Sequence, residues 1–151
     1  MPVKLNGYKY LASLDIDDFL LPFNYQFLDY LRERRGISLD PGLLESPNFI
    51  NGTGMTREQV FLAIDGFHRE RPDAQQAEPE AVEMLKRFRD QGLSLPALSG
   101  RSFAWEAVTR YQLERNFGSL VKDVFLTGFQ GEAGWKRKSQ ICREQRIAGH
   151  V

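Results

Sequence analysis

Short apolar runs alternate with amphipathic segments along the chain, so strands and helices are predicted in alternation. Residues 10–16 are mostly apolar and end in closely spaced carboxylates, a pattern typical of a buried strand that carries acids at its C-terminal end. Residues 93–98 and 123–127 are predicted as further strands. Pro96 argues against the first of these, because proline has no N–H to donate to a central ladder.

Several segments have the apolar spacing of amphipathic helices. They lie between Pro22 and Gly36, from Thr56 to a polar stretch at 71–78, and over residues 80–90, 103–116 and 138–145. Glycine is favoured just after the end of a helix, so Gly36 is a plausible stop for the first helix. Thr56 with Gln59 three residues later forms a capping-box pattern at the start of the second. Residues 38–54 are rich in glycine, proline and asparagine and are predicted to be irregular.

The order of these elements predicts an α/β fold in which a parallel sheet has helices on its faces. In such folds ligands bind beyond the carboxyl ends of the strands, where the paired carboxylates and Ser99 lie. A length of 151 residues suits a single domain with a real core. Within it, residues 1–21 and 79–151 are predicted to form the α/β core, and residues 22–78 a small helical cap.

Charge and cysteine content narrow the partners and the compartment. The 20 Lys and Arg residues balance the 20 Asp and Glu residues, so no net field favours nucleic acid or an anionic membrane. Cys142 is the only cysteine and cannot form an internal disulfide. The N-terminus lacks the apolar core of a signal peptide and no stretch could span a bilayer, so a cytoplasmic location is expected.

Asp15 and Asp17 are the first candidates for chemistry. A carboxylate can attack phosphorus if its charge is neutralised, and a second acid two residues along a strand end can exchange protons with the leaving group. A lone aspartate after a strand more often caps a helix or lies in a solvated loop. The apolar strand before these two acids, and the residues described next, reverse that preference.

Ser99 and Lys138 could complete such a site. The Ser99 hydroxyl and the amides of Gly100 and Arg101 can donate to phosphoryl oxygens, although a serine before glycine is also an ordinary turn element. Lys138 opens the last predicted helix and could place an ammonium group against phosphate and nucleophile. Lys136 competes for that role, and the whole basic turn could equally be solvated.

These features, in this order, resemble the haloacid dehalogenase (HAD) superfamily: a strand ending in Asp-x-Asp, a later strand ending in Ser or Thr, and then a lysine before a helix. The stretch YLASLDIDDFLLPFNYQFLDYLRERR, residues 10–35, is similar to the opening of the 5'(3')-deoxyribonucleotidase-like branch. Residues 80–101, ERNFGSLVKDVFLTG at 114–128 and KSQICRE at 138–144 are similar to later stretches of that branch. The resemblance implies a HAD-like Rossmannoid sheet with a small helical cap.

The resemblance also implies roles for individual residues. Asp15 would be the phosphoryl-accepting nucleophile, and Asp17 the general acid and base. Magnesium would bridge Asp15, the main-chain carbonyl of Asp17 and a phosphate oxygen, as suits a hard ion. The remaining residues are Ser99, Gly100, Arg101 and Lys138 as phosphate ligands, and Phe23 as an aromatic near a nucleobase, for which packing inside the cap is an equal alternative.

Two departures from this branch bear on activity. Gly100 stands where relatives usually have a second hydroxyl. The fourth motif, an acidic pair on one more strand, would come after the sequence given, and residues 147–151 resemble the approach to that strand. On this interpretation the last core strand is missing, magnesium binding and turnover are weak, and residues 10–16 present an open edge through which the chain could form a homo-oligomer.

The leading functional hypothesis is a magnesium-dependent phosphomonoester hydrolase acting through an aspartyl-phosphate on a nucleotide or a similar small phosphate. The first alternative is a degenerate or truncated HAD-like domain that binds phosphate or a partner without turnover. A receiver-type signalling domain is disfavoured, because its phosphoacceptor would lie on a middle strand, where this chain has Ser99.

Overall fold

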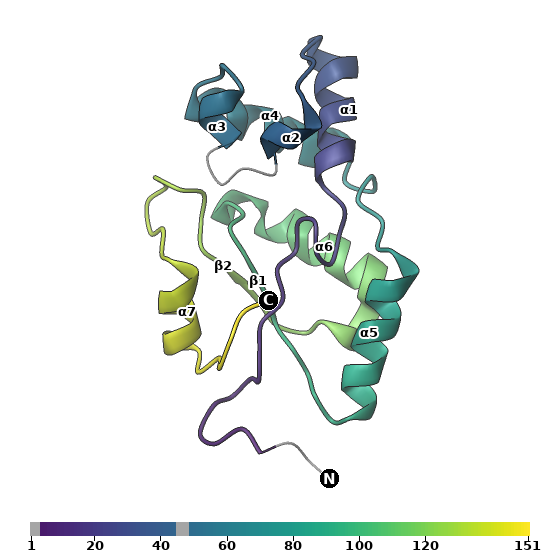
Figure 1. Cartoon of the computed structure of the whole chain (residues 1–151), viewed down its shortest axis with the longest axis vertical. Coiled ribbons are helices and arrows are strands. Elements are labelled where there is room, and N and C mark those ends of the chain that lie inside the picture. The colour runs from purple at the N-terminus through teal and green to yellow at the C-terminus, as the bar shows by residue number, and fades with distance from the viewer. Residues whose placement is uncertain (1–3, 45–48) are drawn as a thin grey trace.

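Extended segments from distant parts of the chain lie side by side at the centre of the molecule, with helices around them (Figure 1). The structure is a computed structural model that describes residues 4–44 and 49–151. The α-helices are α1 (Asn24–Arg35), α2 (Pro41–Leu44), α3 (Phe49–Gly52), α4 (Arg57–Glu70), α5 (Pro79–Asp90), α6 (Glu106–Phe117) and α7 (Lys138–Glu144). Single 3-10 turns at Phe103–Trp105 and Gly118–Leu120 flank α6.

The central pairing is parallel, as the alternation of elements predicts. Strand β1 (Ala97–Ser99) pairs with β2 (Val124–Leu126), so that Ser99 lies opposite Leu126. Residues 10–16 run along the other side of β1 as an extended segment with isolated bridges, which is less regular than the predicted strand. Pro96 precedes β1 and contributes only its carbonyl, which accepts from the N–H of Leu14 at 2.9 Å, so it breaks no ladder.

Residues 147–151 lie parallel to the start of the chain. The N–H groups of Ser13 and Asp15 donate to the carbonyls of Gly149 and Val151 at 2.9 and 2.8 Å, and the Val151 N–H donates back to Ser13 at 2.9 Å. The prediction that residues 10–16 present an open edge is therefore wrong. Backbone hydrogen bonds join this segment to neighbours on both sides.

The helix ends follow the chemistry of their residues. Gly36 ends α1 with a φ of 65°, in the left-handed region that glycine adopts without strain. Thr56 and Gln59 form both hydrogen bonds of the predicted capping box at the start of α4. The prediction of irregular structure across residues 38–54 is wrong in part, because α2 and α3 each make a single helical turn there.

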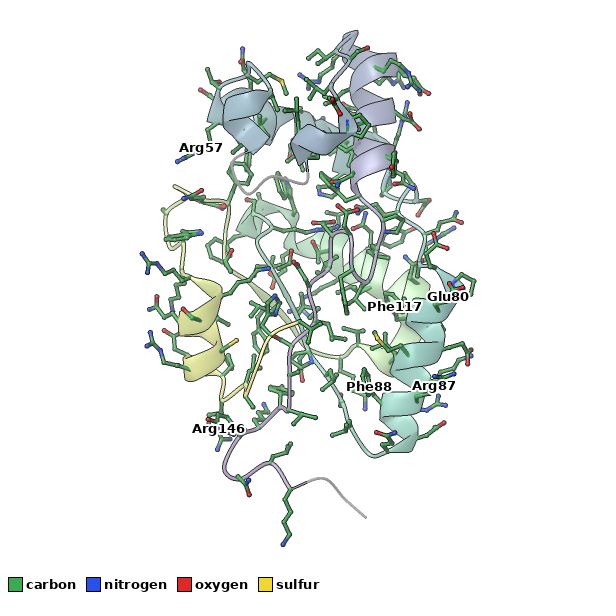
Figure 2. All side chains as sticks on the ribbon, viewed as in Figure 1. Arg57, Glu80, Arg87, Phe88, Phe117 and Arg146 are labelled. Carbon is green, nitrogen blue, oxygen red and sulfur yellow. The ribbon has the colours of Figure 1, made fainter. Side chains whose placement is uncertain are left out.

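The buried apolar residues form two clusters. One joins the face of the sheet to α5 and α6, where Phe88 and Phe117 lie (Figure 2). The other joins α1 to α4 around Phe27 and Phe67, and Trp105 enters it from the segment after β1. The four helices α1–α4 thus have a hydrophobic core of their own above the sheet, and the domain boundaries proposed at residues 22 and 78 stay a prediction.

No helix in the described ranges has the length and apolar character needed to cross a membrane.

Candidate active site

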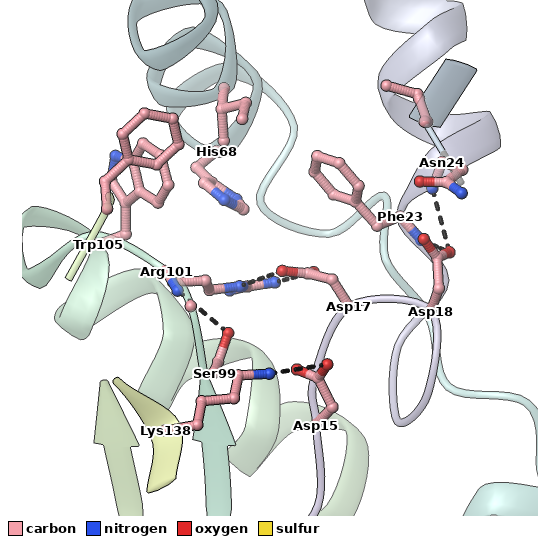
Figure 3. A pocket seen from close by; sticks show the side chains of 14 residues that line it. Asp15, Asp17, Asp18, Phe23, Asn24, His68, Ser99, Arg101, Trp105 and Lys138 are labelled. Atoms are coloured by element: carbon pink, nitrogen blue, oxygen red, sulfur yellow. Dashed lines mark hydrogen bonds and ion pairs between the residues drawn. The ribbon is translucent and has the colours of Figure 1, made fainter. Parts of the chain in front are cut away.

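A cavity of about 730 Å³ opens where the C-terminal end of the sheet faces α1 and α4 (Figure 3). The sequence-predicted site residues all line it: Asp15, Asp17, Phe23, Ser99, Gly100, Arg101 and Lys138. These residues come from four separate stretches of sequence. The order of strands and helices brings them together because parallel strands end at the same edge.

Asp15 and Lys138 form the charged pair at the floor of this cavity. The Lys138 ammonium lies 3.1 Å from Asp15 Oδ2, and about a third of each side chain is exposed. Asp15 Oδ1 accepts from the N–H of Ile16 at 2.8 Å, which fixes the direction of the carboxylate. Asp15 is thus held, charge-compensated and open to a ligand. Lys136 pairs instead with Glu144 at 2.9 Å, away from Asp15.

His150 links Lys138 to Ser13 through its two ring nitrogens. Its Nε2 lies 3.3 Å from the Lys138 ammonium, and its Nδ1 lies 2.8 Å from the Ser13 hydroxyl. Because an ammonium group only donates, Nε2 accepts and Nδ1 carries the proton. Burial, followed by the charge of Lys138, lowers the pKa of His150, which favours this neutral form. No spacing in the sequence links His150 to Ser13 or Lys138, so no local pattern predicts this contact.

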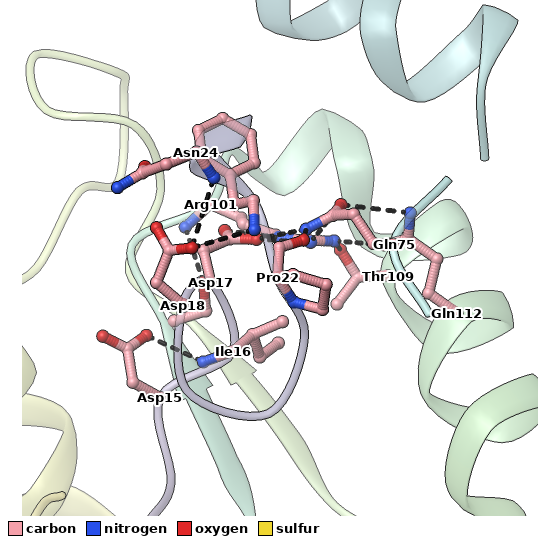
Figure 4. A network of polar contacts seen from close by, with 12 residues as sticks. Asp15, Ile16, Asp17, Asp18, Pro22, Asn24, Gln75, Arg101, Thr109 and Gln112 are labelled. Atoms are coloured by element: carbon pink, nitrogen blue, oxygen red, sulfur yellow. Dashed lines mark hydrogen bonds and ion pairs between the residues drawn. The ribbon is translucent and has the colours of Figure 1, made fainter. Parts of the chain in front are cut away.

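Asp17 is bound by a forked pair to Arg101 (Figure 4). Arg101 NH2 donates to Asp17 Oδ1 at 2.8 Å and Nε donates to Oδ2 at 3.0 Å, while Gln75 Nε2 donates to Oδ1 at 2.9 Å. Burial alone would raise the pKa of Asp17. The charge and hydrogen bonds of Arg101 outweigh burial and leave the pKa below its ordinary value. Asp17 is therefore held as a carboxylate.

Arg101 has no N–H group to spare. Besides Asp17, its guanidinium donates to Thr109 Oγ1 at 3.0 Å, to Gln112 Oε1 at 2.6 Å and to Gln75 Oε1 at 3.0 Å. These contacts use all five donors of the guanidinium, and the side chain is only 2% exposed. Although Arg101 lines the cavity, its side chain faces protein acceptors, so its guanidinium is not free to bind phosphate.

Ser99 keeps a free donor. Its hydroxyl oxygen accepts from the N–H of Arg101 at 3.3 Å, so the hydroxyl proton can point to a ligand. Gly100 is exposed at the rim, and a Cβ there would meet only Thr127 Oγ1 at 3.8 Å. Its missing side chain thus reflects no steric demand and leaves space at the predicted phosphate position.

Asp18, the third acid of the run, is a structural residue. It adopts a φ of 60°, and its carboxylate accepts from the N–H groups of Phe23 and Asn24 at 2.9 and 3.2 Å at the start of α1. Phe23 stacks on Phe27, with ring centroids 5.1 Å apart, and also lines the cavity. Phe23 thus packs against α1 and also borders the cavity, and its role near a nucleobase stays a prediction.

The roof of the cavity was missed from the sequence. It is made by Asn24, Leu44, Ile64, His68, Trp105 and Phe129. Helical spacing marks Ile64 as a core residue, but no local pattern indicates which side chains of α1 and α4 face the sheet.

Asp15 provides the carboxylate oxygens that a magnesium ion would need, and the Asp17 carbonyl stays a predicted ligand. In the part of the chain that the structure describes, no three Asp, Glu, His or Cys side chains gather into a metal-holding group. Magnesium commonly uses one or two carboxylates together with waters and substrate phosphate, and Asp15 fits that sparse mode of binding.

Comparison with known proteins shows the fold but no sequence family. No protein-family model matches the sequence. No curated protein matches it either. A HAD family hydrolase from Deinococcus radiodurans, solved with bound phosphate and sodium, is 13% identical with a TM-score of 0.58, over 90% of this chain and 67% of that one.

Two further solved structures give the same result. A HAD-superfamily hydrolase of subfamily IA from Geobacter sulfurreducens is 18% identical, with a TM-score of 0.52, over 97% of this chain and 79% of that one. A protein from Haemophilus somnus described as a predicted phosphoglycolate phosphatase is 13% identical, with a TM-score of 0.55, over 92% and 74%. The three share an arrangement of elements with this chain.

Proposed function

We propose that this chain, whose fold is that of the haloacid dehalogenase superfamily, is a magnesium-dependent phosphomonoester hydrolase of nucleotidase-like specificity. The observation that carries the proposal is the Asp15–Lys138 pair at the floor of the cavity, 3.1 Å apart and partly exposed. A carboxylate in this position can approach phosphorus, because the adjacent ammonium group offsets the repulsion between two anions.

In the proposed reaction, Asp15 attacks the phosphorus atom and the ester oxygen departs, which leaves an aspartyl-phosphate and an alcohol. Water then attacks the phosphorus atom, releases inorganic phosphate and restores the Asp15 carboxylate. The Ser99 hydroxyl, the amides after it and the Lys138 ammonium hold phosphoryl oxygens in both steps. Magnesium, when bound, would add charge neutralisation beside Asp15.

Asp17 is proposed to give a proton to the leaving oxygen and later to take one from water. Its environment makes this difficult. Three hydrogen bonds and the charge of Arg101 favour the carboxylate form, so Asp17 is seldom protonated at neutral pH. Aryl phosphates, whose leaving aryl oxide needs no proton, should therefore be hydrolysed faster than alkyl phosphates.

The ionised state of Asp17 favours a second candidate function, a phosphate-binding HAD-like domain that turns over slowly or not at all. A poor proton donor at Asp17 slows release of the alcohol, and a sparse metal site weakens binding. The small phosphorylated partner would be the same in both cases, and only turnover distinguishes them.

Hydrolysis of 4-nitrophenyl phosphate with magnesium and with EDTA tests the proposal. We expect Asp15→Asn to abolish magnesium-dependent turnover and keep the fold, because the amide is isosteric but cannot act as a nucleophile. Asp29→Asn, on the exposed face of α1, is the matched control and should keep wild-type rates. Phosphate binding without turnover in the wild type would favour the second candidate, and turnover by Asp15→Asn would refute the mechanism.

A further inference from the structure

His68 is buried in the roof of the cavity without a hydrogen-bond partner. The side chain belongs to α4, is 3% exposed and has neither ring nitrogen bonded to any described residue. In Figure 3 its ring projects from α4 toward the space above Arg101 and Asp17. A buried polar group left unpaired destabilises the folded state, so such a residue calls for an explanation such as a bound ligand or a function.

The ring of His68 is neutral at physiological pH. Burial and then the charge of Arg101 lower its pKa to about 4, although Asp17 and Asp65 act in the opposite direction. A neutral imidazole offers one N–H donor and one acceptor. Whatever meets this edge therefore needs a complementary donor or acceptor, and the neutral ring has no positive charge with which to compensate an anion.

Aromatic and aliphatic side chains surround this edge. Trp105 lies beside the His68 ring, with centroids 5.1 Å apart, and Phe61 stacks on Trp105 at 5.0 Å. Phe23 and Ile64 complete an apolar wall on the side of α1 and α4. Such a wall favours a flat, apolar group over a small hydrated one.

Among the residues that the structure describes, none that lines the cavity offers a free cation to a carboxylate on the ligand. Among the described lining residues the charged groups are Asp15, Asp17, Asp18, Arg101 and Lys138. Arg101 spends all its donors within the protein, and Lys138 is paired with Asp15 at the floor. An anionic leaving group near His68 would lose its hydration without compensation.

We propose that the roof of the cavity binds an uncharged, planar leaving group with a hydrogen-bonding edge, and that His68 recognises this edge and so determines specificity. This inference rests on the proposed phosphomonoesterase function. It separates this chain from phosphatases of small phosphorylated acids, because their substrates carry a carboxylate that this roof has no group to pair with.

Three aryl phosphates test the inference: 4-carbamoylphenyl and 4-carboxyphenyl phosphate, which have nearly the same shape, and the apolar 4-methylphenyl phosphate. We compare kcat/KM of each substrate between wild type and His68→Phe, so that differences in intrinsic reactivity cancel. The carbamoyl substrate should lose about tenfold relative to the methyl substrate in His68→Phe, as one neutral hydrogen bond is worth. His68→Gln keeps a donor and an acceptor and should recover part of the loss.

Leu62→Val, exposed on the same helix and outside the lining of the cavity, is the matched control and should leave the ratios between the three substrates unchanged. Binding of the three free phenols to the wild type, followed by tryptophan fluorescence, needs neither turnover nor a variant that folds. The carbamoyl phenol should bind more tightly than the carboxylate, and the reverse order would overturn the inference.

The two proposals fail in different ways. If the wild type hydrolyses all three esters but shows no preference that depends on His68, the inference is wrong and the phosphatase function stands. If no ester is hydrolysed but the carbamoyl phenol still binds preferentially and His68→Phe removes the preference, the inference holds and the hydrolase function fails.

Discussion

At the scale of single residues, spacing predicted which side chains meet but not which way they face. Asp15, Ser99 and Lys138 follow from strand ends and a helix start, features that local sequence encodes. The direction of Arg101 depends on Gln75 and Thr109, which lie far from each other in sequence. No local pattern can show that these acceptors gather around one guanidinium.

Arg101 is predicted to contribute more to stability than any exposed arginine. Replacing it by methionine removes the positive charge beside the Asp17 carboxylate and five hydrogen bonds from a buried network, so we expect Arg101→Met to lose about 3–5 kcal/mol of unfolding free energy. Arg32→Met removes an exposed pair with Asp29 and should change stability by less than about 1 kcal/mol. Urea denaturation measures both, and equal small losses would show that the buried network stabilises little.

At the scale of elements, helix ends that carry a capping residue in the sequence were predicted correctly. Thr56 and Gln59 begin α4 and Gly36 ends α1, as local chemistry requires. Residues 38–54 were predicted irregular from their turn formers, yet α2 and α3 form there. Their apolar residues Leu44 and Ile50 pack on the cluster between α1 and α4, and tertiary packing overrides weak propensity.

Gly66 is predicted to set how closely α1 and α4 approach. A Cβ at this position of α4 would overlap the buried hydroxyl of Tyr30 on α1, whereas the Tyr30 ring carbon Cζ would lie at 3.5 Å. Gly66→Ala should therefore lose about 1–3 kcal/mol in the wild type through overpacking. In a Tyr30→Phe background the same change should be neutral or gain up to about 1 kcal/mol from helix propensity.

A double-mutant cycle by chemical denaturation checks this reversal of sign. The cycle removes whatever Tyr30→Phe costs by itself. If Gly66→Ala destabilises both backgrounds equally, the hydroxyl is not the group that keeps glycine at this position.

At the scale of the whole molecule, the cavity lies between two hydrophobic clusters, and its shape depends on how they are joined. Sequence periodicity predicted apolar faces on the helices and the sheet, and both clusters follow from them. It did not predict the roof, since the docking of α4 over the sheet decides that His68 and Trp105 face the same space. The docking of α4 depends on the complementary shapes of the packed surfaces, which hydrophobic periodicity does not encode.

Trp105 comes from the sheet side and is buried in the cluster of α1 and α4. It is 4% exposed, its indole N–H donates to Asp65 of α4 at 3.0 Å, and its ring packs on Phe61 and Phe129. Because it lies in the 3-10 turn Phe103–Trp105 shortly after β1, it couples the roof of the cavity to the edge that carries Ser99 and Arg101. Losing it should loosen the roof before it loosens the sheet.

Trp105→Ala is therefore expected to destabilise the molecule unevenly. The cavity left by the indole should cost about 3–5 kcal/mol where it forms, between the segment after β1 and α4. Native-state amide hydrogen exchange should speed up most in α1 and α4 and least in α5, since local opening draws on the region that lost its contacts. Phe117→Ala, in the cluster of α5 and α6, is the matched control and should give the opposite order. Uniform loss of protection across α1, α4 and α5 in both variants would mean that the two clusters unfold as one unit, and that Trp105 is no separate joint between roof and sheet.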